Sequence, residues 1–505
     1  MGRARRSLRA ATAGSLASMI DLTRRYRGLA GVAVVLAVVG GCAAGVPDTD
    51  RAAPAPDRPV VDATLDMAPD LSSATGTQTV RFTPDTRVCE LVFRLWANRP
   101  TASEDGTSSE VTRASVGGTP VTPRVEQAGA PDGAPGTLVE LPLPSCAEAG
   151  TPVTADLSFR LTLGADSAER IGYSPSAGTA WLGSPLPVLD HVRGRGWVRE
   201  PALDISGETV VSEDVRLNSL AVTSGDDQQV AGVGTPTGSS PAAPGRTTRT
   251  FTADAIRDVA IAVGAYRITE TTVGGTRVHV ALPAAGRAGA GDGESGGSEQ
   301  GGDLRGSASD WSESVADNLT RLEQLLGPHP YPDLWVTIVP TQSDGVEFPT
   351  HVQFGDVSNG TRPSLVAHEL AHMWFYALVG NDQARDPWLD ESFATWAQAI
   401  VSDQFDYYRL DKYSAGSDGR IGDPMRVWDR RGGFDGYVTG VYDQGAAALL
   451  EGRRRVGAER FDEAVRGYLD ANAHRVAGPA DVERAFAGLP PVLDVLREHG
   501  AFTQS

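Results

Sequence analysis

Residues 364–375 have the sequence SLVAHELAHMWF, and this stretch indicates the fold of the second half of the chain. Pro363 can open a helix at its first turn and Gly380 can close one, so we expect the stretch to be helical. His368 and His372 then stand at positions i and i+4, and their imidazoles project from one face of the helix. This arrangement suits two bonds to a single Zn²⁺ ion.

Glu369 lies beside the two histidines but is angled away from the ligand direction. There it can act as a general base and accept a proton from water at the metal. A catalytic zinc site also needs a third protein ligand and one open position. A second helical stretch, residues 388–397, supplies Glu391, and its aromatic and apolar side chains would pack it against the first helix. The sequence therefore predicts one Zn²⁺ per chain, held by His368, His372 and Glu391.

The alternative for a pair of helical histidines is a hydrogen-bonded pair in the core, or two surface residues. Histidine is scarce, with 8 in the chain, so composition alone would seldom produce this pattern. The placement of both histidines on one helix, together with Glu391, favours the metal site.

These motifs resemble the M1 family of gluzincin aminopeptidases. Members of that family have HExxH followed by a glutamate in a WLNEGFA-like segment, and residues 388–394 here are WLDESFA. The resemblance also covers the order of the domains, a β-rich one before a catalytic one. It implies a thermolysin-like catalytic domain, bound zinc, and peptide substrates with a free N-terminus.

The resemblance also assigns a substrate-binding glutamate. Family members have a GxMEN or GMEYP-like segment before the zinc helix, whose glutamate binds the substrate's α-amine. Residues 345–349 are GVEFP, which maps that role to Glu347. A fixed carboxylate near the scissile bond would favour trimming from the N-terminus. The alternative is an ordinary loop acid, and the chain departs from the family in having Val346 for Met and Pro349 where many members have Asn.

A tyrosine completes the site that the resemblance implies. Residues 441–446 are VYDQGA, similar to the family's VYEKGA-like segment, so Tyr442 would stabilise the oxyanion. Tyr437 is a nearby competitor, and core packing is the alternative for either. After Phe375 the family usually continues with Gly-Asn, whereas this chain has Tyr376 and Ala377. Many members carry a large helical domain after the catalytic one, which we expect to be lacking in this sequence.

The rest of the chain predicts an α+β multidomain protein. From 59 to 265, short apolar-alternating runs separated by turn signals indicate an all-β N-terminal domain. Helical and strand patterns alternate from 266 to 505, which indicates a mixed α/β catalytic domain. Within it, residues 284–306 are crowded with Gly, Ser and acids, so we expect a disordered loop there.

The N-terminus has the pattern of an export signal. Arginines precede an apolar run at residues 29–39, which is short for a membrane span. The run closes on Gly-Gly-Cys42, similar to a bacterial lipobox, so we expect residues 1–42 to be a signal peptide and Cys42 to carry lipid. An ordinary signal peptide with an incidental cysteine is the alternative. Translation could start at Met1 or Met19. Residues 43–58 would form a flexible tether on the outer face of the cytoplasmic membrane.

Cysteine count and charge agree with export. Once Cys42 is assigned to lipid, Cys89 and Cys146 remain, and an even pair in an oxidising compartment predicts a disulfide. A thiol catalyst is the weaker interpretation. The net charge of -19 argues against a nucleic-acid partner, so we expect membrane contact only through the lipid. The sequence does not indicate an oligomeric state.

Two other functions remain open at this point. Without anchoring by Glu347, the same zinc chemistry would give an endopeptidase or a hydrolase of another small substrate. A surface lipoprotein could also use the fold for binding with a silent site. The intact zinc set favours an enzyme, and the leading hypothesis is an aminopeptidase.

Overall fold

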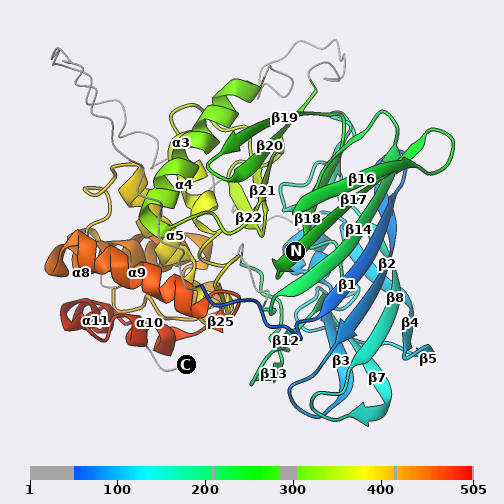
Figure 1. The fold of residues 1–505 in the computed structure, drawn as a ribbon, viewed down its shortest axis with the longest axis horizontal. Coiled ribbons are helices and arrows are strands. Elements are labelled where there is room, and N and C mark those ends of the chain that lie inside the picture. Colours follow the sequence, from blue (N-terminus) through cyan, green and yellow to red (C-terminus); the bar gives the residue numbers. More distant parts are fainter. Residues whose placement is uncertain (1–50, 206–210, 285–303, 414–417, 503–505) are drawn as a thin grey trace, which may run out of the picture.

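The computed structural model describes residues 51–205, 211–284, 304–413 and 418–502. The signal peptide, Cys42 and most of the 284–306 loop lie outside the described residues. Figure 1 shows an all-β half beside a half that carries the helices, with the sheet formed by β19 to β23 between them. Among the described residues, no helix is long and apolar enough to cross a membrane.

The N-terminal domain is built on a large sheet whose buried and exposed side chains alternate. In β8 (Val153–Thr162), Ala155, Leu157, Phe159 and Leu161 are buried and the residues between them are not, which is the period of a half-buried strand. The sheet has the order β16 (Thr235–Pro241), β17 (Arg246–Ile256), β14 (Val215–Gly225), β1 (Val60–Met67), β2 (Ser73–Phe82), β8, β4 (Ser108–Val116) and β5 (Thr119–Val121).

Two four-stranded sheets and the short hairpin of β12 (His191–Val192) and β13 (Gly196–Trp197) complete this domain. One has the order β15 (Gln229–Ala231), β18 (Ala260–Gly264), β10 (Thr179–Gly183) and β9 (Ile171–Ser174). The other has the order β11 (Val188–Leu189), β3 (Val88–Arg94), β7 (Leu138–Ala147) and β6 (Arg124–Glu126). In that third sheet a disulfide joins Cys89 of β3 to Cys146 of β7, with the two Cα atoms 4.1 Å apart.

The second domain has a mixed sheet covered by helices. Its strand order is β19 (Tyr266–Val273), β20 (Thr276–Pro283), β21 (Asp333–Ile338), β23 (His351–Phe354) and β22 (Gly345–Phe348). Strands β20, β21 and β23 run parallel, and β22 is an antiparallel edge strand. Every residue of β21 is buried, as expected for a central strand with both faces covered.

The helices that position the site are amphipathic or fully buried. A capping box between Ser307 and Asp310 opens α3, and its apolar stripe, including Trp311 and Leu319, is buried. The main helices are α3 (Ala308–Leu326), α4 (Arg362–Ala371), α5 (Glu391–Val401), α6 (Met425–Arg431), α7 (Gly433–Tyr437), α8 (Gln444–Val456), α9 (Ala458–Asn472), α10 (Pro479–Ala485) and α11 (Pro490–Glu498).

Residues 51–58 pack against both domains, which differs from the flexible tether expected there. The Ala52 amide donates to the Asp470 carbonyl at 3.0 Å, and Arg51 donates to the Pro328 carbonyl at 2.8 Å. At the other end, Arg58 pairs with Asp254 of β17 at 2.7 Å. Two arginines thus fasten this segment to the protein, a feature that its Pro and Ala content concealed.

A buried ion pair of the N-terminal domain contacts the second domain close to the predicted zinc helix. Arg257 and Asp214 of the N-terminal domain lie 2.8 Å apart, each with a 3% exposed side chain. Asp214 also contacts His474 Nδ1 at 2.6 Å, and Arg257 Nε donates to the Ala377 carbonyl at 3.3 Å. Both contacts reach the second domain. Through Arg257, the N-terminal domain therefore supports the loop that follows α4.

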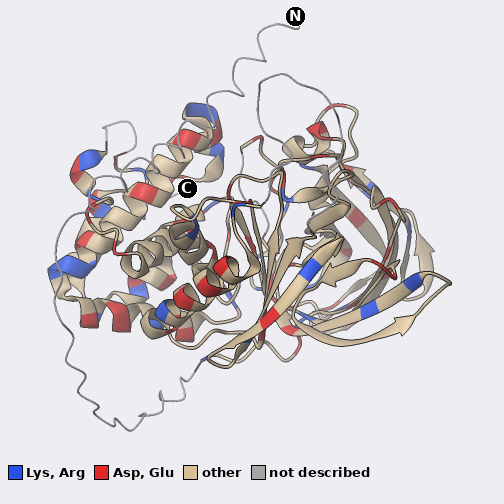
Figure 2. Ribbon diagram, turned by 90° about the horizontal axis from the view of Figure 1, so that it is seen from above, with Lys and Arg blue, Asp and Glu red and all other residues tan. Residues whose placement is uncertain are grey.

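Surface charges of both signs are interspersed on the helices of the second domain (Figure 2). Many are paired on neighbouring turns, such as Arg454 with Glu451 at 2.7 Å, or between helices, such as Arg453 of α8 with Asp462 of α9 at 2.7 Å. An exposed pair such as Arg454–Glu451 contributes little stability, about 0–1 kcal/mol.

Candidate active site

Two imidazoles and one carboxylate converge in the core of the second domain. His368 Nε2 and His372 Nε2 are 3.2 Å apart, and Glu391 Oε2 lies 3.3 Å from each of them. All three side chains are buried. His368 is on α4, His372 is its C-terminal cap, and Glu391 is the first residue of α5. The packing of α4 against α5 therefore brings together the three residues that the sequence predicted as ligands.

Helix α4 ends earlier than the sequence predicted. It stops at Ala371, and the amides of Met373 and Trp374 bond to carbonyls three residues back in tighter turns. Tyr376 then adopts φ 106°, a region that favours glycine, at the position where the resembling family has glycine. This turn places the Phe375 carbonyl 3.1 Å from His372 Nδ1.

The Phe375 carbonyl fixes the tautomer of His372. A carbonyl oxygen can only accept, so Nδ1 carries the proton and donates it. The lone pair of Nε2 is then directed toward His368 and Glu391, as metal ligation requires. The sequence alone did not reveal this contact.

Electrostatics around His372 favour a bound cation. Burial disfavours the charged imidazole, but neighbouring carboxylates outweigh burial and raise the pKa of His372 well above its usual range. These carboxylates belong to Glu347, Glu391 and Glu369. Burial also opposes ionisation of Glu391, yet the charge on His372 and hydrogen bonds from both imidazoles hold the pKa of Glu391 well below its usual range. For His368, burial dominates and lowers the pKa.

The donor set fits zinc. The ligand atoms of His368, His372 and Glu391 all lie within 4.8 Å of one another. Two imidazole nitrogens with one carboxylate oxygen are a donor set of catalytic zinc sites. Three buried carboxylates around the imidazoles leave an excess of negative charge, which a divalent cation would neutralise without protonating a ligand.

Glu347 and Glu369 form the other side of the same cluster. Their carboxylates and the His372 imidazole also have atoms within 4.8 Å of one another, and both glutamates are buried. Glu347 comes from the edge strand β22, where it pairs with Val352 of β23. A Cβ built at Gly345, the first residue of β22, would overlap the Glu369 side chain. Only glycine therefore lets this strand approach the base so closely.

Tyr442 approaches the cluster from a π-helix, Val438–Asp443. Its hydroxyl donates to Glu391 Oε1 at 2.5 Å, and its ring stacks on the His368 ring with centroids 5.6 Å apart. Tyr437 is fully buried and packs edge-on against Tyr442, with centroids 5.4 Å apart. The Tyr442 side chain therefore contacts two of the predicted metal ligands, Glu391 through its hydroxyl and His368 through its ring. π-helical turns occur often at functional sites, but the sequence did not predict this one.

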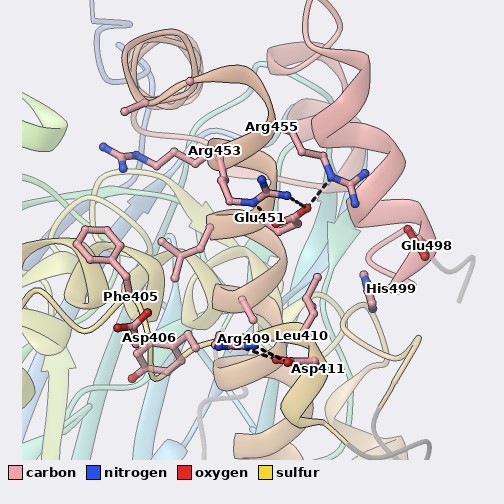
Figure 3. A pocket seen from close by; sticks show the side chains of 16 residues that line it. Phe405, Asp406, Arg409, Leu410, Asp411, Glu451, Arg453, Arg455, Glu498 and His499 are labelled. Carbon is pink, nitrogen blue, oxygen red and sulfur yellow. Dashed lines mark hydrogen bonds and ion pairs between the residues drawn. The ribbon is translucent and has the colours of Figure 1, made fainter.

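A cavity of about 840 Å³ lies apart from the metal cluster, between α8, the 405–411 loop and the end of α11 (Figure 3). Its arginines face it in ion pairs, such as Arg409 with Asp411 and Arg455 with Glu451. None of the predicted site residues lines it. The chemistry described above therefore belongs to the cluster around His372.

Part of the second domain matches a known protein family. Residues 357–491 match the model of the peptidase family M1 domain. Aminopeptidase N from Streptomyces lividans is 31% identical over 136 residues, which are 23% of this chain and 15% of that protein. Aminopeptidase M1-A from Oryza sativa subsp. japonica is 31% identical over 133 residues, again 23% of this chain and 15% of that protein. The chain thus spans about 15% of the length of these curated relatives.

The likeness in fold extends over both domains. An M1 zinc metallopeptidase from Deinococcus radiodurans superposes with a TM-score of 0.59 at 19% identity, covering 89% of this chain and 95% of that one. A mutant two-domain M1 zinc metallopeptidase bound to L-arginine gives a TM-score of 0.63 at 19% identity, covering 88% and 94%. The expected architecture, an all-β domain followed by an α/β domain, is therefore confirmed. Residues 357–491 of this chain are thus similar in sequence to the peptidase family M1 domain, and they lie in a fold similar to that of solved M1 zinc metallopeptidases.

Proposed function

We propose that this chain is a zinc-dependent aminopeptidase that removes residues from the N-terminus of peptides. The observation that carries the proposal is the convergence of two further carboxylates, Glu347 and Glu369, on His372, which also stands in the ligand group with His368 and Glu391. Zinc bound to His368, His372 and Glu391 would act as a Lewis acid on the scissile carbonyl and lower the pKa of water.

The side chains divide the remaining work. Glu369 accepts a proton from the attacking water and gives it to the leaving amine, since its carboxylate lies beside the ligand His372. Tyr442 donates a hydrogen bond to the carbonyl oxygen as negative charge builds on it. Glu347 accepts from the ammonium group of the substrate's first residue, which sets the scissile bond one residue from the end.

The names of similar proteins support this assignment. The curated relatives that match are called aminopeptidases, and a mutant of the Deinococcus radiodurans metallopeptidase has been solved with a Tyr-Ser-Ala substrate. A short peptide with a free N-terminus is the corresponding substrate class for this chain.

Replacing Glu369 by Gln tests the chemical step. The variant should keep its zinc, because Glu369 is not in the ligand set, and kcat on an aminoacyl fluorogenic substrate should fall by about a hundredfold or more. Glu313→Gln on α3 is a matched control and should leave kcat unchanged. Turnover retained in Glu369→Gln, with zinc bound, would remove Glu369 from the mechanism.

Comparison of free with N-acetylated peptides tests the anchoring. Acetylation removes the charge that Glu347 is proposed to bind, so the wild type should cleave only the free peptide. In Glu347→Gln, kcat/KM for the free peptide should fall by about tenfold to a hundredfold, because a charge-assisted hydrogen bond is lost. Equal cleavage of both peptides by the wild type would instead indicate an endopeptidase.

We also propose, from the sequence of residues 24–42, that the protein is exported and lipid-anchored through Cys42. The Cys89–Cys146 disulfide supports an oxidising compartment. Cys42→Ala should release the protein from the membrane fraction and abolish labelling by a fatty-acid probe. Persistent labelling in that variant would exclude Cys42 as the lipidated residue.

A further inference from the structure

Two adjacent residues of α5 contact two adjacent residues of the π-helix. Glu391 Oε1 accepts from the Tyr442 hydroxyl at 2.5 Å, and Ser392 Oγ donates to the Val441 carbonyl at 2.6 Å. Ser392 is fully buried, so its hydroxyl is shielded from bulk water. The start of α5 therefore holds both a side chain and the backbone of the segment that carries Tyr442.

The geometry around Ser392 leaves its hydroxyl little freedom. A Cβ built at Gly445 would overlap the Ser392 hydroxyl, so α8 approaches α5 at a distance that only glycine permits. On the other flank of Tyr442, a Cβ built at Gly440 would overlap the Trp428 ring. The segment is thus confined at both ends, and Ser392 is the hydroxyl that reaches its backbone from the helix of the third ligand.

A donor at this point suits a π-helix. The wider turn replaces the regular i→i−4 ladder here, and the Ser392 hydroxyl adds a side-chain hydrogen bond to a carbonyl within it.

We propose that Ser392 is a positioning residue that sets the reach of Tyr442 into the site through the Val441 carbonyl. The inference rests on the proposed function, because it concerns the group that would stabilise the oxyanion. Ser392 itself touches neither substrate nor metal in this scheme. Its contribution appears only when Tyr442 has a phenol to place, since an error of about 1 Å in a catalytic group can cost about a hundredfold in rate.

The test is a double-mutant cycle on kcat with Ser392→Ala and Tyr442→Phe. Ser392→Ala should lower kcat by about tenfold to a hundredfold, leave KM within about twofold, and leave zinc affinity, measured by chelator competition, within about twofold. In the Tyr442→Phe background, the same change should alter kcat by less than about twofold, because the positioned phenol is already absent.

Ser212→Ala is the matched control. Ser212 is also a buried serine whose hydroxyl donates to a carbonyl, that of Arg257 at 2.7 Å. This control should lower the unfolding temperature and leave kcat unchanged. Ser392→Cys keeps the shape of the side chain with a somewhat larger atom and a weak donor, and the same cycle is run with it if the alanine variant does not fold; an intermediate kcat is expected.

Two results would overturn the proposal. One is an unchanged kcat in Ser392→Ala. The other is a loss that multiplies fully with Tyr442→Phe, or that comes with weaker zinc binding, because Ser392 would then act on α5 and Glu391 rather than on Tyr442. A wild-type kcat in Tyr442→Phe alone is a distinct outcome: it removes Tyr442 from the proposed mechanism and the positioning role with it.

Discussion

The proposed metal donors and the groups proposed to act on the substrate are held by different kinds of structure. His368 and Glu391 belong to α-helices in the core, and His372 caps one of them. Glu347 lies on an edge strand, and Tyr442 lies in a π-helix. Within a regular helix, the distance between two side chains follows directly from their separation in sequence. The position of an edge strand or a π-helix depends on the elements packed against it. The two histidines are therefore placed by the spacing of one helix, whereas Glu391, Glu347 and Tyr442 are placed by packing between elements.

Loss of a proposed metal ligand should have the largest effect. His372→Ala removes a ligand and leaves Glu347, Glu369 and Glu391 close together without an imidazole between them. Zinc affinity should fall by more than about a hundredfold, and activity should be lost with it, because outer-shell changes alone cost about 10- to 100-fold. Zinc content by mass spectrometry measures this. Full zinc occupancy in the purified variant would show that another donor completes the set.

Tyr442→Phe separates the two sets. We expect kcat to fall by about 10²–10³, the cost of one lost oxyanion donor, while zinc stays bound by the helices. Tyr437→Phe should cost less, because it is the Tyr442 hydroxyl that donates to the proposed ligand Glu391, at 2.5 Å. Steady-state kinetics on both variants checks the order. A larger loss for Tyr437→Phe would reassign the oxyanion role.

The pH dependence of stability tests a histidine that lies outside the proposed ligand set. Burial lowers the pKa of His351 from 6.5 to about 4, with its ring bonded to the Gly232 carbonyl and the Thr337 hydroxyl. The neutral form is favoured on folding, so its stabilisation is complete above pH 6.5 and falls as the pH drops toward 4. Linkage gives a loss of about 2 kcal/mol by pH 5. His351→Gln should flatten the fall in unfolding temperature between pH 7 and pH 5, and an unchanged slope would contradict the assignment.

The smallest expected effect comes from the close packing of β22 against Glu369. Gly345→Ala adds a methyl group where the Glu369 side chain lies, so the strand or the base must shift. We expect kcat to fall by about tenfold with zinc retained. Gly275→Ala is the control, because a Cβ there meets no atom within 4 Å. Equal kinetics for both variants would show that β22 yields without disturbing the base.

How much could be predicted follows the same division. Histidines at i and i+4 and an apolar second helix predicted His368, His372 and Glu391 from spacing alone. Glu347 and Tyr442 came only from a family resemblance, since no local pattern places an edge strand or a π-turn against a distant helix. Ser392 and the Phe375 carbonyl were missed, because one is a single hydroxyl in a buried helix and the other is a backbone atom. Residues 51–58 were mistaken for a tether because the partners of Arg51 and Arg58 are remote in sequence.

The contact between Arg257 and the Ala377 carbonyl has a consequence for anyone who would shorten this protein. A chain cut at Tyr266 would retain every predicted catalytic residue, yet it would lose Arg257 and Asp214. The buried Ala377 carbonyl and His474 would then lack the groups that meet them, and an apolar face would be bared to solvent. The N-terminal sheets and the second domain are separate in architecture, but the second domain depends on contacts with the first.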